Sequence, residues 1–121
     1  MHDFFSDTKT KPSMEMRKTV LTCSVGDEQK SEDPTTIELC KQTAELLGKE
    51  AAIFLPSGTM CNLTALLCWC NRGSEIILGD KSHIFLFEQA GAAQYGGIAF
   101  HPLQNIDDGT FDMQQVRNAI R

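Results

Sequence analysis

The sequence lacks any run of lysine and arginine residues and any long hydrophobic stretch. Its 121 residues carry 11 basic and 16 acidic side chains, for a formal net charge of −5. Binding a series of nucleic-acid phosphates requires clustered positive charge, so nucleic acid is not an expected partner. No stretch has the length of a membrane-spanning helix, and the first residues lack the basic and apolar regions of a targeting segment. We therefore expect a cytoplasmic protein with no membrane partner.

The cysteines also lack the spacing of a metal or redox motif. Their number is odd and they form no C-x-x-C motif, which favours reduced thiols in a reducing compartment. The five residues are Cys23, Cys40, Cys61, Cys68 and Cys70. A zinc site at Cys68 and Cys70 with a histidine is the alternative. Residues two apart on a helix point to different sides, however, so we expect no metal site.

The expected elements alternate between helix and strand after a non-periodic arm at residues 1–12. The patterns predict a helix at 13–23, a loop at 24–33, a helix at 34–47, a strand at 51–56, a helix at 58–71, a strand at 75–79, a helix at 84–95, a strand at 98–103 and a last helix after Asp112. This order predicts an α/β fold with a parallel sheet and flanking helices. Because three strands make a thin sheet, we expect residues 13–121 to be part of a larger, truncated domain.

A polar turn lies between the strand at 51–56 and the following helix, in the segment FLPSGTMCN. At the start of a helix, the free N–H groups and the positive end of the dipole favour a bound anion. Gly58 allows close approach to the backbone, and Ser57 and Thr59 offer hydroxyl donors. The alternative is that Ser57 only caps the helix. The motifs G-x-x-x-x-G-K-[ST] and G-x-G-x-x-G are absent, which argues against a nucleotide phosphate.

A second polar cluster, Gly79 to His83, follows the strand at 75–79. If the two strands are neighbours, His83 lies beside the Gly58 turn, where its imidazole can stack on a flat cofactor or act as a base. A capping or solvent-facing histidine is the alternative.

Five segments, taken in order, resemble the amino-terminal part of the threonine aldolase family: FFSDTKTKPSMEMRK, VGD…EDPTTIEL, LLGKEAAIFLPSGTMCN, RGSEIILGDKSHIFLFE and DDGTFDMQQVRNAIR. The resemblance runs from about Asp3 to Arg121. These enzymes depend on pyridoxal 5′-phosphate (PLP) and have the aspartate aminotransferase-like fold type I. The resemblance therefore implies that the chain is a partial large domain of that fold.

The resemblance also implies roles for individual residues. Ser57, Gly58 and Thr59 match the segment that holds the PLP phosphate. His83 matches the catalytic histidine that stacks on the pyridine ring and assists proton removal from the substrate hydroxyl. Ser6 matches a contact to the substrate carboxylate, whereas composition alone suggests only a solvated arm.

The implied activity is cleavage of L-threonine or L-allo-threonine to glycine and acetaldehyde, a step of threonine catabolism and glycine biosynthesis by a homo-oligomeric enzyme. The Schiff-base lysine of the family has no counterpart in this chain, so we expect weak or absent PLP binding and no activity. The lysines that do not match it are Lys9, Lys11, Lys18, Lys30, Lys41, Lys49 and Lys81. One alternative is a non-catalytic fragment that associates with full-length subunits. Another is a free-standing phosphate-ligand binding module.

Overall fold

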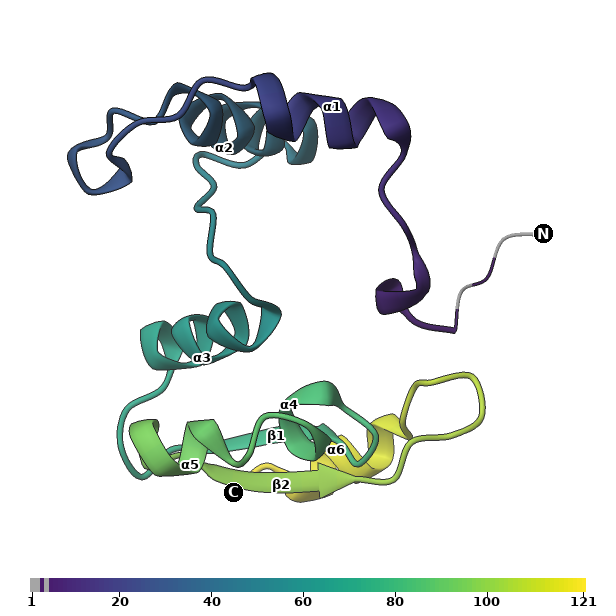
Figure 1. The fold of residues 1–121 in the computed structure, drawn as a ribbon. Coiled ribbons are helices and arrows are strands. Elements are labelled where there is room, and N and C mark those ends of the chain that lie inside the picture. The colour runs from purple at the N-terminus through teal and green to yellow at the C-terminus, as the bar shows by residue number, and fades with distance from the viewer. Residues whose placement is uncertain (1–2, 4) are drawn as a thin grey trace. The chain divides into compact units, whose positions relative to one another are not determined.

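The computed structural model describes residue 3 and residues 5–121, which form two compact units, residues 1–54 and 55–121. Residues 1, 2 and 4 of the expected arm lie outside the described residues. The division between an arm at 1–12 and a domain at 13–121 stays a prediction. The two units are described separately, and Figure 1 shows the elements of each.

The amino-terminal unit is helical. It contains the 3-10 helices η1 (Asp7–Lys9) and η2 (Glu28–Lys30) and the α-helices α1 (Met14–Thr22) and α2 (Pro34–Leu47). Ser13 Oγ accepts the Met16 N–H at 3.2 Å, and Asp33 Oδ1 accepts the Thr36 N–H at 2.7 Å. These caps are the start signals in the sequence. The predicted helices at 13–23 and 34–47 are confirmed.

The predicted buried strand at 51–56 is wrong. These residues have no strand partner among the described residues, and Ile53 and Phe54 are exposed. An apolar run favours extended backbone, but a strand exists only where a second strand accepts and donates its hydrogen bonds. The turn at Ser57 is therefore preceded by unpaired chain.

The second unit has an α/β architecture with a parallel sheet, as predicted. Its elements are α3 (Gly58–Trp69), β1 (Glu75–Gly79), α4 (His83–Leu86), α5 (Gly91–Gly96), β2 (Ala99–Leu103) and α6 (Met113–Ala119). The two strands pair in parallel from Glu75 opposite Ala99 to Gly79 opposite Leu103. Both strands therefore end at the same edge of the sheet. Among the described residues, no helix combines the length and the apolar character needed to cross a bilayer.

The core of this unit lies between the sheet and its helices. Ile98 is 1% exposed, and the Phe85 and Phe100 rings lie edge to face with their centroids 5.9 Å apart. This contact packs α4 on β2. The other buried apolar residues are Leu78, Ala92, Leu103 and Ala119.

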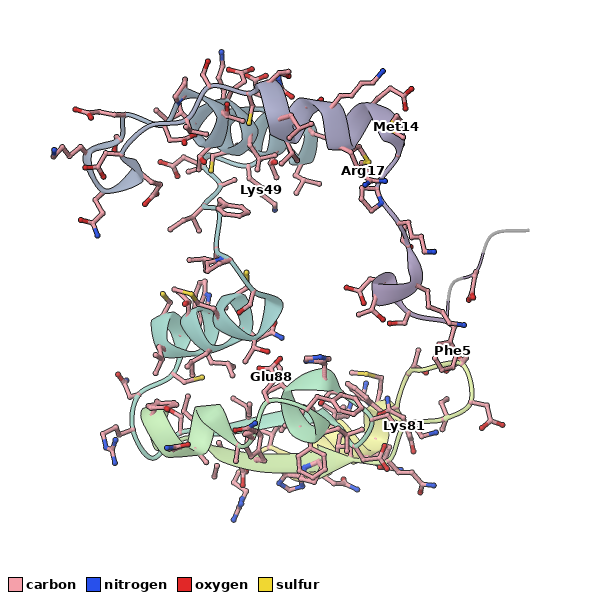
Figure 2. The ribbon with its side chains drawn as sticks, viewed as in Figure 1. Phe5, Met14, Arg17, Lys49, Lys81 and Glu88 are labelled. Carbon is pink, nitrogen blue, oxygen red and sulfur yellow. The ribbon has the colours of Figure 1, made fainter. Side chains whose placement is uncertain are left out.

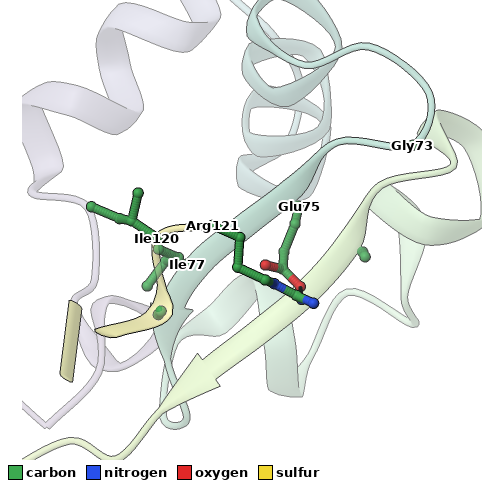
Figure 3. Close-up of a pocket in the computed structure, with 7 residues that line it drawn as sticks. Gly73, Glu75, Ile77, Ile120 and Arg121 are labelled. Carbon is green, nitrogen blue, oxygen red and sulfur yellow. Dashed lines mark hydrogen bonds and ion pairs between the residues drawn. The ribbon is translucent and has the colours of Figure 1, made fainter. Parts of the chain in front are cut away.

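The end of the chain lies in a groove of about 610 Å³ over the sheet, shown in Figure 3. Arg121 Nη2 donates to Glu75 Oε1 at 2.5 Å, and His101 Nδ1 lies 3.4 Å from Glu75 Oε2. The Arg121 guanidinium, followed by His101, holds the pKa of Glu75 below its usual value. Arg121 is thus linked to the first residue of β1.

The prediction of one helix at 84–95 is wrong, because the structure has two short helices there, α4 and α5. Gln89 and Ala90 both adopt left-handed backbone, with φ of 50° and 55°. Two left-handed residues in a row end an α-helix, and for residues with a side chain this conformation is costly. Helical periodicity does not reveal such a break, because the apolar spacing continues on both sides of it.

The left-handed backbone at Ala90 predicts that Ala90→Gly stabilises the protein. Glycine adopts this conformation without a Cβ penalty, so the free energy of unfolding should rise by about 0.5–1 kcal/mol after the entropic cost of glycine is subtracted. Ala93→Gly, in the exposed part of α5, is the matched control and should lower it by about 0.5–1 kcal/mol. Urea denaturation measures both changes. A loss of stability in Ala90→Gly would contradict the assigned backbone.

Candidate functional site

The turn at the start of α3 keeps backbone donors free. Ser57 is the N-cap, and its Oγ accepts the Met60 N–H at 3.1 Å, while Ser57 O accepts the Cys61 N–H at 3.0 Å. Among the described residues, the N–H groups of Gly58 and Thr59 donate to no acceptor. The turn therefore both caps the helix and leaves two donors at its positive end.

The surface of this turn is open to a ligand. Ser57, Gly58 and Thr59 are exposed, and a Cβ built on Gly58 would meet no atom within 4 Å. The Ser57 hydroxyl accepts from Met60, so its own proton is free to be donated. Two N–H groups and two hydroxyls next to a helix N-terminus are a suitable donor set for a phosphate.

His83 begins α4 at the carboxyl edge of the sheet, where the turn after β1 meets the loop after β2. Asn105, in that loop, joins the two. Its N–H donates to Asp80 Oδ1 at 2.9 Å, and its Oδ1 accepts the Lys81 N–H at 2.9 Å. Its amide also donates to the carbonyl of Gly109 at 3.0 Å. Asn105 thus fixes the backbone that carries His83.

A buried carboxylate connects His83 to α3. Glu88 Oε1 lies 2.7 Å from His83 Nδ1 and accepts the Asn62 amide at 2.6 Å. Asn62 lies one turn after Gly58 on α3, and Figure 2 shows Glu88 on the side of its segment that faces that helix. Glu88 therefore links His83 to α3, the helix that begins at the turn of Ser57, Gly58 and Thr59.

The imidazole itself remains accessible. The His83 side chain is 62% exposed, and its ring lies 5.3 Å from the Phe87 ring, at an interplanar angle of 52°. Glu88 and Thr59 also line a cavity of about 320 Å³, together with Leu63, Phe87, Gln89, Gly91, Gln94 and Tyr95. A hollow thus lies between the start of α3 and the segment that follows His83.

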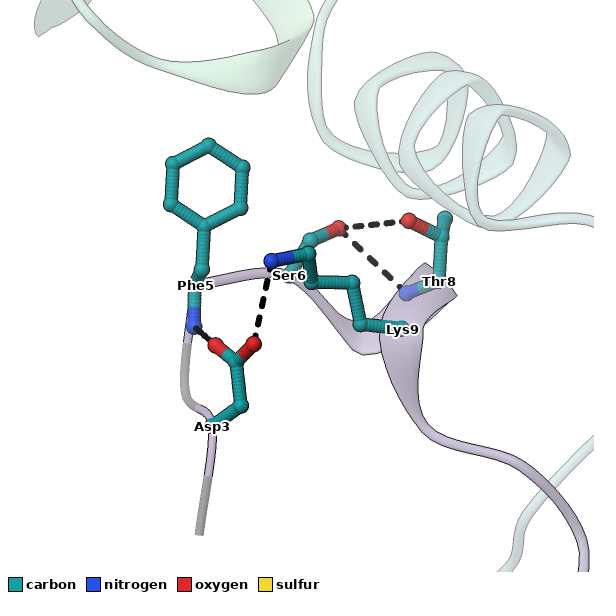
Figure 4. Close-up of polar contacts among 5 residues, drawn as sticks. All are labelled: Asp3, Phe5, Ser6, Thr8 and Lys9. Carbon is teal, nitrogen blue, oxygen red and sulfur yellow. Dashed lines mark hydrogen bonds and ion pairs between the residues drawn. The ribbon is translucent and has the colours of Figure 1, made fainter. Parts of the chain in front are cut away.

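Ser6 lies in the amino-terminal unit, so its expected contact to a substrate carboxylate stays a prediction. Its Oγ accepts the Thr8 N–H at 3.3 Å and lies 2.8 Å from Thr8 Oγ1 (Figure 4). Beside it, the Phe5 N–H, followed by the Lys9 ammonium, holds the pKa of Asp3 below its usual value. Polar contacts thus join residue 3 and residues 5–9 of the arm to one another.

Sequence reasoning missed Asn62, Glu88 and Asn105. Glu88 stands in the predicted helix 84–95 as one acid among apolar residues, a position that favours a solvated side chain. In the structure α4 ends at Leu86, before Glu88, and the Glu88 side chain is buried. Asn105 precedes a recognised turn and gave no separate signal.

The five cysteines are free thiols in the structure. In the part of the chain that the structure describes, no three His, Cys, Asp or Glu side chains gather closely enough to hold a metal ion. The candidate functional groups are therefore the turn of Ser57, Gly58 and Thr59, and His83.

The comparison with known proteins identifies the family. The model of the beta-eliminating lyase family matches residues 3–121. The chain belongs to the beta-eliminating lyase family. It is 45% identical over 120 residues to a probable low-specificity L-threonine aldolase 2 of Arabidopsis thaliana, covering 98% of this chain and 34% of that protein.

Two further relatives extend this picture. A low specificity L-threonine aldolase of Escherichia coli K12 is 46% identical over 121 residues, covering 100% of this chain and 36% of that protein. An alanine racemase of Cochliobolus carbonum is 35% identical over 103 residues, covering 84% of this chain and 26% of that protein. The chain spans about a third of the length of the threonine aldolases it matches.

Family members depend on PLP, and the residues at the start of α3 fit its phosphate. The fit rests on the open backbone at Gly58 and on the free N–H groups of Gly58 and Thr59. The mixed helix and strand structure with a small parallel sheet is consistent with part of a PLP fold type I domain, as expected from the resemblance.

The position of Asn105 predicts that Asn105→Ala destabilises the second unit. It removes three side-chain hydrogen bonds and leaves the Lys81 N–H without its acceptor, which should lower the free energy of unfolding by about 1–3 kcal/mol. Asn118→Ala is the control, because Asn118 is exposed and accepts only from Gln114 within α6. Urea denaturation of the control should differ from the parent by less than about 0.5 kcal/mol. Equal effects would contradict the role of Asn105.

Proposed function

We propose that the chain provides the phosphate-binding turn and the base histidine of a PLP-dependent threonine aldolase. The reaction is cleavage of L-threonine or L-allo-threonine to glycine and acetaldehyde. The observation that carries the proposal is that α3 begins with free N–H groups at Gly58 and Thr59 and is also tied, through Asn62 and Glu88, to His83 of α4. The names of the relatives from Arabidopsis thaliana and Escherichia coli support the reaction.

In this proposal the groups of the site have different tasks. The N–H groups of Gly58 and Thr59 and the Ser57 hydroxyl bind the phosphate, and His83 stacks on the ring and takes the proton of the substrate β-hydroxyl. When bound, PLP supplies an electron sink for the Cα–Cβ bond that breaks. Ser6 contacts the substrate carboxylate, and residues 13–121 form part of the PLP-binding domain.

The remaining parts of the proposal concern the whole protein. The enzyme acts as a homo-oligomer on an amino acid in the cytoplasm, in threonine catabolism and glycine biosynthesis. The free thiols support a reducing compartment. In the 121-residue chain alone, we expect weak PLP binding and no aldolase turnover.

A second function is favoured by the amino-terminal unit, whose apolar side chains are largely uncovered. Among its described residues only Ala44 is buried, while Val20, Leu21, Leu46 and Leu47 are 63–85% exposed. Such side chains favour association with another surface. We infer as the alternative a non-catalytic fragment that associates with full-length subunits. This role requires no ligand at Gly58.

Titration of the 15N-labelled chain with PLP tests the phosphate turn. The amide signals of Gly58 and Thr59 should shift with PLP and shift much less with pyridoxal, which lacks the phosphate. Ser57→Asp keeps an N-cap acceptor but adds a negative charge, so it should weaken PLP binding about tenfold or more while the helix remains capped.

Ser13→Asp is the matched control, because Ser13 caps α1 in the same way. It should leave PLP binding unchanged. Equal shifts with pyridoxal and PLP, or undiminished binding by Ser57→Asp, would rule out the phosphate turn and leave the association role.

A further inference from the structure

We propose that Glu88 is a positioning residue that holds the neutral His83 imidazole in the Nδ1–H tautomer, and that Asn62 holds Glu88 in place. The tautomer leaves the Nε2 lone pair as the acceptor on the accessible side of the ring. The catalytic use of this lone pair rests on the proposed function, whereas the tautomer itself does not.

The burial of the two side chains differs sharply. The Glu88 side chain is 4% exposed, whereas that of His83 is 62% exposed. Glu88 is also the only buried polar or charged residue among the described residues. A buried carboxylate requires strong hydrogen-bond donors, and here they come from His83 and Asn62.

The geometry determines which atom donates. Glu88 Oε1 lies 2.7 Å from His83 Nδ1 and 2.6 Å from Asn62 Nδ2. An ionised carboxylate only accepts hydrogen bonds, and the Asn62 amide is a donor. Nδ1 must therefore carry the hydrogen in the His83–Glu88 bond, and in the neutral ring Nε2 is then unprotonated.

The backbone after Glu88 supports this arrangement. The helix α4 already ends at Leu86, the left-handed residues Gln89 and Ala90 prevent it from resuming, and the Gly91 N–H donates to the Glu88 carbonyl at 2.9 Å. Glu88 is five residues after His83, so in a continuous helix the two side chains would point to nearly opposite faces. The break thus allows a bond between two side chains that helical spacing would separate.

The consequence for chemistry is a directed base. Glu88 orients the ring through Nδ1, so Nε2 faces the accessible side, and the carboxylate stabilises the imidazolium that forms when Nε2 takes a proton. Asn62 extends the chain of bonds to α3, the helix that begins at the phosphate-type turn. The base and the turn thus have a common support.

The tautomer can be read directly by 1H–15N NMR of the histidine-labelled 121-residue chain at alkaline pH, with His83→Gln to assign the signals. In the parent chain we expect the Nδ1–H form of His83 to exceed the Nε2–H form about tenfold or more, because a hydrogen bond to a buried charge favours it. In Glu88→Gln this excess should fall about tenfold. Glu75→Gln is the matched control, since Glu75 lies near Nδ1 of His101 and not of His83, and it should leave the ratio unchanged.

A predominant Nε2–H form in the parent chain, or an undiminished excess in Glu88→Gln, would overturn the proposal. If Glu88→Gln fails to fold, the parent chain still decides, through a nuclear Overhauser contact between the Nδ1 proton and the Glu88 side chain. Its absence would also overturn the proposal. None of these readouts involves PLP, so failure of the phosphate turn and failure of the tautomer are distinguishable.

Discussion

The hydrogen bonds that the buried Glu88 carboxylate accepts from His83 and Asn62 are the interaction on which the site depends. Burying a charge is unfavourable unless donors surround it, so Glu88 stays inside only while both partners are in place. Through these bonds a very short helix, α4, is tied to the much longer α3. The left-handed break at Gln89 and Ala90 is the conformational cost of this arrangement.

Much of the fold was predictable because local signals agree with the tertiary structure. Asp33 with Pro34, and Ser57 before Gly58, mark helix starts that the structure contains, and the alternation of elements predicted a parallel sheet. The prediction of a strand at 51–56 was wrong because hydrogen-bond pairing with a second strand cannot be read from the local sequence. The burial of Glu88 was not predicted because the two left-handed residues, Gln89 and Ala90, carry side chains, so neither position has the glycine that would indicate a break. Sequence reasoning therefore predicted the turn and His83 as candidate site residues but missed the side chains that connect them.

The comparisons bear on what this segment contributes. It matches proteins named for two reactions, threonine aldolases and an alanine racemase. If the turn binds the phosphate of a cofactor, as proposed, it would suit both reactions, because it does not select the bond that reacts. In the proposed division of labour, the turn at Gly58 serves the cofactor, and His83 with its Glu88 support serves proton transfer. In this proposal, cofactor binding and proton transfer belong to two adjoining parts of one unit.

The coupling between Glu88 and Asn62 is the most direct measure of this account. A double-mutant cycle with Glu88→Ala, Asn62→Ala and the double variant, followed by urea denaturation, isolates the free energy of their interaction. The account predicts a coupling of about 1–3 kcal/mol, because each single change already breaks the shared bond. Additive effects, with a coupling below about 0.5 kcal/mol, would contradict the claim that Glu88 ties the His83 segment to α3.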